Sequence, residues 1–188
     1  MEIAGHLAHT LRQLRKQRGW SLDKASEATG VSKAMLGQIE RGESSPTVAT
    51  LWKIATGFGT AFSGLITPPP HALDLPFFAR NTQSDAELPA DCLQVRPLFP
   101  FNAHFGFELM ELTLPPHTEH LSEPHEAGVI EHVTVTRGRM DVKIDDRWHT
   151  LDTGEAIRFS ADAPHGYRNP GDNPATFHNL IHYPAGTR

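Results

Sequence analysis

Residues 21–42 read SLDKASEATGVSKAMLGQIERG and carry the signals of two short helices joined by a tight turn. Ser21 can cap the first helix, because its side-chain oxygen can accept a hydrogen bond from an unpaired backbone amide of the first turn. A Thr-Gly-Val triplet at 29–31 interrupts that helix, and Ser32 can cap the second. Gly42 follows as a stop signal. The stretch therefore predicts a helix, a turn and a second helix with a polar outer face.

The flanking sequence extends this pair to an all-α unit. A preceding amphipathic helix is predicted by three leucines at i, i+4 and i+7, namely Leu7, Leu11 and Leu14. Ser45-Pro46 predicts the start of a fourth helix, since proline is tolerated in a first turn, and residues 60–66 predict a short fifth. We expect residues 1–66 to form a five-helix domain, which is about the smallest size that folds alone.

The rest of the chain has a different pattern. Thr67 is followed by three prolines that cannot continue a helix, so residues 67–76 are predicted to be a Pro-rich linker. Residues 77–188 show no long helical period. Short runs rich in β-forming residues, separated by turn signals, predict strands at 105–109, 129–137, 140–144 and 176–183, with one more near 92–98. Closely spaced strands without intervening helices predict an all-β sandwich or barrel.

Composition excludes several classes of protein. The chain has 188 residues, of which 38% are hydrophobic and 21% charged, and this argues against global disorder and fibrous repeats. No stretch approaches the ~18 to 20 apolar residues of a membrane helix, and the first residues lack the pattern of a secretion signal. The single cysteine, Cys92, cannot form an internal disulfide. We expect a cytoplasmic protein with no membrane partner.

The net charge of −5 hides an uneven distribution. Residues 1–66 contain eight Lys and Arg against five Asp and Glu, a balance of +3, so the remainder carries −8. Ten of the twelve histidines and fourteen of the fifteen prolines also lie after residue 66. A basic head and an acidic, histidine-rich body indicate two domains of different chemistry.

The second helix of the quoted pair carries side chains suited to reading DNA. Lys33, Gly37 and Arg41 recur every four residues, with Ala34 and Gln38 on the adjacent strip, and we expect them on one solvent-facing surface. Glutamine can bond adenine, lysine can reach guanine, and alanine can contact a thymine methyl group. Candidates for contacts to backbone phosphates are Arg12, Arg15, Arg18, Lys24 and Ser44. The alternative is that any small helical bundle is polar on its outside.

The string from residue 11 to residue 65 resembles the lambda/434-repressor-like (XRE) helix-turn-helix family. The motifs that carry the resemblance are Trp20-Ser21-Leu22, Thr29-Gly30-Val31-Ser32, Leu36, Ile39-Glu40-Arg41-Gly42 and Pro46-Thr47. The resemblance implies a domain whose third helix reads double-stranded operator DNA. The residues implicated in DNA binding are Ser32, Lys33, Ala34, Met35, Gln38 and Arg41, with Ser44 on the adjoining backbone.

Two further expectations concern this head. Glu40 is expected to stabilise the helical bundle, because an acid beside phosphates would repel them. A balance of +3 is modest, so one head should bind weakly, and two heads about one turn of DNA apart would double the phosphate contacts. We therefore expect a homodimer.

Two later stretches resemble the two motifs of the cupin family. One runs from His125 through Glu131 to Gly138, and the other joins Gly154 to Pro164-His165 and Asn169. The resemblance implies an all-β cupin (jelly-roll) barrel with a divalent metal bound by His125, Glu131 and His165.

The chain departs from the cupin motif at one position. Ala127 stands where a second histidine is expected, which removes one ligand. Two imidazoles and a carboxylate still suit Zn, Fe, Mn or Ni. Candidates for a fourth ligand are His178, His182 and His120. The alternative is that the metal site is lost and these side chains bond an organic ligand or one another.

The mouth of a small barrel is also suited to a small-molecule effector. Candidate lining residues are Phe107, Val133, Val135 and Tyr167, with Arg158 to bind a ligand carboxylate.

Together the two parts resemble the XRE-cupin class of bacterial transcription regulators. This resemblance implies a barrel that senses a small metabolite, such as an amino acid, a peptide or a polyamine, and a head that acts on an operator, with repression favoured over activation. The alternative is a metal-dependent cupin enzyme, a dioxygenase or isomerase, fused to a DNA-binding head. We expect a regulator and no enzyme, because Ala127 depletes the site and no additional acid–base pair is evident.

Overall fold

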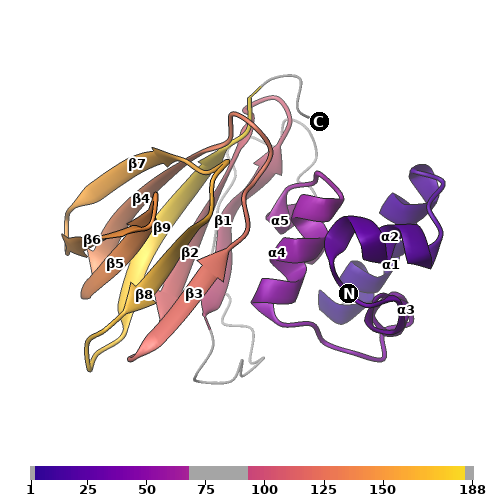
Figure 1. Ribbon diagram of the computed structural model, residues 1–188, viewed down its shortest axis with the longest axis horizontal. Helices are drawn as coiled ribbons and strands as arrows, with labels where there is room; N and C mark the ends of the chain where they lie inside the picture. The colour runs from indigo at the N-terminus through magenta and orange to yellow at the C-terminus, as the bar shows by residue number, and fades with distance from the viewer. Residues whose placement is uncertain (1–2, 68–92, 185–188) are drawn as a thin grey trace.

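The computed structural model describes residues 3–67 and 93–184, which form a helical part followed by a β-rich part (Figure 1). Cys92 and most of the predicted linker at 67–76 lie outside the described residues. The helices are α1 (Ile3–Gln17), α2 (Leu22–Thr29), α3 (Lys33–Glu40), α4 (Val48–Gly57) and α5 (Phe62–Ile66). The strands are β1 (Gln94–Asn102), β2 (Phe107–Leu114), β3 (Thr118–Ser122), β4 (Ile130–Arg137), β5 (Arg139–Ile144), β6 (Arg147–Asp152), β7 (Ala156–Ser160), β8 (His165–Asn169) and β9 (Ala175–His182).

The helix-turn-helix is confirmed together with its caps. The side chains of Ser21 and Ser32 accept hydrogen bonds from the amides of Lys24 and Met35 at 3.1 and 3.3 Å. Gly30 ends α2 with φ +66°, a conformation that glycine adopts at little cost. The core of the helical part contains Leu7, Leu11, Leu36, Ile39, Ile54 and Phe58.

The predicted start of the fourth helix was wrong by a few residues. α4 begins at Val48, after Ser45-Pro46, because Thr47 provides the cap. Its hydroxyl accepts a hydrogen bond from the amide of Thr50 at 3.2 Å. A side-chain acceptor at this position is a stronger start signal than a tolerated proline.

The β-rich part consists of two antiparallel sheets that face each other (Figure 1). One sheet has the order β1-β2-β9-β4-β7, and we call it sheet A; the other has the order β3-β8-β5-β6, and we call it sheet B. Buried and half-buried residues alternate strictly along β9, as expected for a strand with one face toward a core. The cupin architecture is confirmed.

Several strands were missed by the sequence pattern. β3, β6, β7 and β8 have five or six residues each and are rich in polar side chains. Such short strands lack the continuous β-forming runs that predict the longer ones. β2 also begins later than expected, because Phe105 lies in the preceding turn with its side chain exposed.

A buried carboxylate joins the two parts. Glu108 on β2 is 0% exposed and accepts hydrogen bonds from the backbone amides of Phe62 and Ser63 at 3.3 and 2.8 Å. The Tyr183 hydroxyl donates to the same carboxylate. The Ser63 hydroxyl in turn accepts a hydrogen bond from the Phe101 amide at 2.8 Å. These contacts satisfy the first turn of α5, which begins two residues later than predicted and has no side-chain cap of its own.

Replacing Glu108 with alanine should lower the free energy of unfolding by about 2–4 kcal/mol, because two buried amides would lose their acceptor. Urea denaturation followed by circular dichroism measures this change. The matched control is Glu111→Ala on the outward face of the same strand, where a half-exposed ion pair with Arg96 is worth about 1 kcal/mol or less. Equal losses in the two variants would contradict the role given to Glu108.

Candidate functional site

The outer face of α3 is available to DNA. This helix lies on the side of the helical part away from the sheets (Figure 1). The predicted DNA-binding residues that are exposed are Ser32, Lys33, Ala34, Met35, Gln38 and Arg41. Ser44 is half-buried in the loop that follows.

Gly37 is buried, so its predicted position on the solvent face was wrong. A Cβ at this position would lie 3.7 Å from Leu22 Cδ1 and 3.2 Å from an Arg41 guanidinium nitrogen. The distance to Leu22 is an ordinary contact, so the side chain that a larger residue would crowd at this position is the Arg41 guanidinium.

Two cations of the DNA-reading face make exposed ion pairs within the head. Lys33 Nζ lies 2.8 Å from Asp23 Oδ2, and Arg41 Nη2 lies 2.7 Å from Glu43 Oε2. Exposed pairs of this kind are weak and screened by salt. Phosphate or base contacts can therefore replace them.

Two arginines expected to contact phosphates instead stabilise the bundle. Arg15 makes a bidentate ion pair with Glu40 at 2.6 and 2.7 Å and donates to the Trp20 carbonyl at 3.0 Å. Arg18 donates to the Phe58 carbonyl and lies over the Trp20 ring. The stabilising role predicted for Glu40 matches this arrangement. The exposed phosphate candidates that remain are Arg12 and Lys24.

A second cluster lies inside the cupin domain. His125 from the β3–β4 loop, Glu131 from β4 and His165 from β8 offer one ligand atom each, and these atoms lie within 4.8 Å of one another. His125 Nε2 lies 2.9 Å from Glu131 Oε1, and His165 Nε2 lies 3.3 Å from the same oxygen. The Ala163 carbonyl lies 2.9 Å from His165 Nδ1 and orients that ring.

The second oxygen of Glu131 is also bonded. Tyr167 donates to Oε2 through its hydroxyl, and the amide of Asn179 donates to the same atom at 2.9 Å. Asn179 was not among the predicted site residues. The alternation of β9 was the available signal, because it places Asn179 on the same inward face as Phe177.

The electrostatics of the cluster favour a charged carboxylate. Burial alone would raise the pKa of Glu131, but the charge of His165 and the hydrogen bond from His125 hold this pKa well below its ordinary value. Burial works against the charged form of His165 as well, yet the Glu131 carboxylate raises its pKa above 6.5. Burial and the neighbouring Glu131 charge raise the pKa of Tyr167 well above 10, so its phenol stays a donor.

This donor set fits a divalent metal. Two imidazole nitrogens and one carboxylate are ligands that Zn²⁺ and other late first-row ions accept. The buried Nε2 of His165 lies 3.3 Å from Glu131 Oε1 but makes no well-directed hydrogen bond to the described residues, so this nitrogen can bind a ligand. Tyr167 and Asn179 donate hydrogen bonds to Glu131, and His165 Nδ1 donates one to the Ala163 carbonyl, which is the outer support that metal ligands need.

Of the three candidates for a fourth ligand, only His120 faces the interior. It pairs with Tyr167 across β3 and β8, and its Nε2 is buried without a partner among the described residues. Burial and the charge of His165 lower the pKa of His120, which keeps its imidazole neutral.

The other two candidates were wrong, because they occupy the outward positions of β9. His178 pairs with Glu111 on the outer face, with 3.6 Å between Nε2 and Oε2, and His182 lies opposite Phe107. Ala127, at the position of the missing motif histidine, is exposed in the β3–β4 loop.

The predicted effector-lining residues do not share one surface. Val133, Val135 and Tyr167 are buried at 3% exposure or less and pack in the core. Phe107 and Arg158 lie on the outer face of sheet A, because their register partners are the outward residues His182 and His132. The prediction that Phe107 and Arg158 line the barrel interior was therefore wrong.

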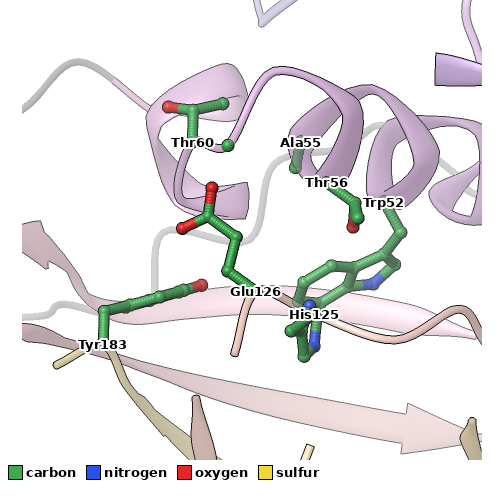
Figure 2. Close-up of a pocket in the computed structure, with 8 residues that line it drawn as sticks. Trp52, Ala55, Thr56, Thr60, His125, Glu126 and Tyr183 are labelled. Atoms are coloured by element: carbon green, nitrogen blue, oxygen red, sulfur yellow. The ribbon is translucent and has the colours of Figure 1, made fainter. Parts of the chain in front are cut away.

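Two cavities lie instead between α4 and the cupin domain, and both are bordered by Trp52, Thr56 and His125. One of them, shown in Figure 2, is further lined by Ala55, Gly59, Thr60, Glu126 and Tyr183. The other is further lined by Ala49, Lys53, His120, Leu121, Ser122 and Glu123. His125, at the edge of the His–Glu–His cluster, thus faces the helical domain, which the sequence pattern did not indicate.

Comparison with known proteins identifies both parts. Residues 11–65 match the helix-turn-helix family model, and residues 110–182 match the cupin domain model. The chain is 50% identical over 182 residues to the HTH-type transcriptional regulator SutR of Escherichia coli K12, with 97% of each protein covered. The chain belongs to the family of HTH-type transcriptional regulators with a cupin domain.

Further relatives agree with this assignment. The crystal structure of an HTH_3 family transcriptional regulator from Vibrio cholerae is 46% identical, with a TM-score of 0.79 and 97% of each chain covered. The HTH-type transcriptional regulator PuuR of Escherichia coli K12 is 23% identical over 159 residues, 85% of each protein. The regulator is thus a DNA-binding protein with an XRE-type head. None of its described helices is long and apolar enough to cross a membrane.

In this regulator, Gln38→Ala should weaken binding to a preferred duplex by about 10- to 100-fold, because one good base contact is worth ~1–3 kcal/mol. Binding to a scrambled duplex should change little. Fluorescence anisotropy with a duplex selected from a random pool measures both affinities. Lys24→Ala is the control, since loss of a phosphate contact should weaken both duplexes alike. A Gln38→Ala variant that loses affinity equally for both duplexes would contradict base reading.

Zinc binding should be lost in His165→Ala and retained in His178→Ala. The first variant removes an inward ligand, whereas the second removes an imidazole from the outer face. Isothermal titration calorimetry with Zn²⁺ should show at least a tenfold loss of affinity for the first variant alone. Equal zinc affinity of wild type and His165→Ala would exclude the cluster as the metal site.

Proposed function

We propose that this regulator is a metal-dependent sensor that represses transcription in the cytoplasm. Its cupin domain binds one divalent ion, Zn, Fe, Mn or Ni, at His125, Glu131 and His165, and a small metabolite near it. The observation that carries the proposal is the convergence of three ligand atoms within 4.8 Å, at a point where the cupin domain meets α4. A metal in this cluster would supply positive charge and open coordination positions to an anionic or chelating metabolite.

The effector acts in this proposal by linkage. A ligand changes operator affinity only by the difference between its affinities for the DNA-competent and DNA-incompetent arrangements. The residues proposed to read bases are Lys33, Ala34 and Gln38, flanked by Ser32, Met35 and Arg41. Amino acids, peptides and polyamines are the effector classes to screen first.

A homodimer is part of the same proposal. The head carries a balance of only +3, and part of its cationic surface is paired internally by Asp23 and Glu43. Two heads on a palindrome would double the phosphate contacts. Sedimentation of the protein bound to its selected duplex should give two chains per duplex.

The proposal is tested by a thermal-shift screen of metals and amino acids on wild type and on His165→Ala. We expect a metal to raise the melting temperature of wild type, and a metabolite to raise it further, because ligands that bind the native state stabilise it. Both shifts should vanish in His165→Ala. Shifts that persist in the variant would place the sensor site elsewhere.

An oxygen-dependent enzyme is the alternative that shares these ligands, since two histidines and a carboxylate also bind Fe(II) in oxygenases. A sensor is favoured because Glu131 Oε2 is already bonded by Tyr167 and Asn179, and because the relative at 50% identity is a regulator. Oxygen uptake by the iron-loaded protein distinguishes them. Sustained turnover would overturn the sensor proposal.

A further inference from the structure

We propose that Trp52 transmits occupancy of the metal cluster to the DNA-reading helix, through its contact with His125. This inference rests on the proposed function and adds the route by which that site controls the head. Nothing in a cupin barrel alone requires such a route. It follows from the way this chain places one ligand of the cluster against α4.

His125 contacts both domains at once. Its Nε2 lies 2.9 Å from Glu131, whereas its ring lies 5.2 Å from the Trp52 ring on α4. Trp52 is itself stacked on Phe62 of α5, with 4.3 Å between ring centres. The His125 side chain is 8% exposed, so it has little room to move without displacing a neighbour.

A metal bound by His125 Nε2 would replace the hydrogen bond that joins this nitrogen to Glu131 Oε1 at 2.9 Å, because a ligating imidazole must give up its proton. The ligand atoms of His125, Glu131 and His165 lie within 4.8 Å of one another, so an ion bound by all three would change the position of the His125 ring.

Of Glu131 and His125, His125 is the residue that can change position when a metal binds. Glu131 is fixed on its other oxygen by Tyr167 and Asn179, and it belongs to a central strand. His125 belongs to the β3–β4 loop. The element that touches the His125 ring from the head is Trp52.

Glu126, the residue after His125, provides a second contact between the β3–β4 loop and the head. Figure 2 shows Glu126 extending toward Thr60 while the neighbouring His125 lies beside Trp52. A Cβ at Gly59 would clash with Glu126 Oε1, so the carboxylate packs directly on the glycine backbone. A displacement of the β3–β4 loop would therefore change two contacts with the head: that of His125 with Trp52 on α4, and that of Glu126 with Gly59 in the turn after α4.

α4 is packed tightly against the helix-turn-helix. A Cβ on Gly57, near the end of α4, would lie 2.5 Å from the Ala28 carbonyl and 2.6 Å from Thr29 Cα at the end of α2. Because the two helices are in such close contact, α4 cannot move toward α2 without displacing it. A shift of Trp52 thus moves α2, and with it α3, relative to the barrel.

The first test measures Trp52 directly by fluorescence. A protein that keeps Trp52 alone (Trp20→Phe, Trp148→Phe) is titrated with Zn²⁺, and a saturable change in emission is expected. The matched control keeps Trp148 alone (Trp20→Phe, Trp52→Phe), and its emission should not change. Adding His165→Ala to the first protein should abolish the response. An unchanged Trp52 emission at saturating zinc would overturn the inference.

The second test measures coupling. The affinity for the selected duplex is determined with and without saturating Zn²⁺, in wild type, Trp52→Ala and Trp20→Phe. Wild type and Trp20→Phe should show the same zinc effect, of about fivefold or more. Trp52→Ala should still bind zinc, because all three ligands remain, and should lose the effect on DNA affinity. Trp52→Phe, which can still stack on Phe62, checks that any loss is not a failure to fold.

The outcomes separate the inference from the proposed function. Equal zinc effects in wild type and Trp52→Ala would overturn the route while leaving a metal-dependent regulator intact. A wild type that binds no zinc would overturn the metal site and the route together. A wild type that binds zinc without any change in DNA affinity would overturn the route and regulation by the metal.

Discussion

The carboxylate of Glu108, buried between the two domains, determines how they sit on each other. A buried carboxyl group needs hydrogen-bond partners, and the backbone amides of Phe62 and Ser63 and the Tyr183 hydroxyl provide them. The same contact supplies the acceptor that α5 lacks at its own start. Because α5 and α4 pack together, the joint also places Trp52 beside His125. Head and barrel are therefore assembled so that the cluster of His125, Glu131 and His165 lies near their boundary.

A second buried carboxylate, Glu131, organises the cluster itself. Two imidazoles contact one of its oxygens, and a phenol and an amide contact the other. Oε2 of Glu131 is therefore held in place by Tyr167 and Asn179, whereas the contacts of Oε1 with the two imidazoles can be replaced by a ligand. A site in which Glu131 is fixed and His125 can move is suited to a switch, because binding or loss of a ligand would displace His125 alone. The missing motif histidine at Ala127 is consistent with a role in sensing.

The sequence predicted the elements whose signals are local. The caps Ser21 and Ser32, the turn at Gly30 and the alternation of β9 each specify their own structure. The three metal-ligand candidates also converged in space, because Glu131 and His165 lie on strands of the two facing sheets and His125 lies in the loop that leads into β4.

The predictions that were wrong concerned residues whose roles depend on contacts between segments far apart in the sequence. Arginine suits a phosphate and a carboxylate equally, so Arg15 and Arg18 could be assigned to the bundle only once Glu40 and the Phe58 carbonyl were placed. The inward and outward positions of a strand follow from its register, and this decided against His178. Glu108 gave no signal, since an acid in an alternating strand ordinarily points to water. The domain junction was not visible in any single motif.

The central claim is that the metal cluster and the DNA-reading helix share one equilibrium, and reciprocity tests it most directly. Zinc affinity of the wild-type protein is measured by calorimetry, once free and once saturated with its selected duplex. The account predicts that DNA changes zinc affinity by the same factor by which zinc changes DNA affinity. Identical zinc affinities in the free and DNA-bound protein would contradict it.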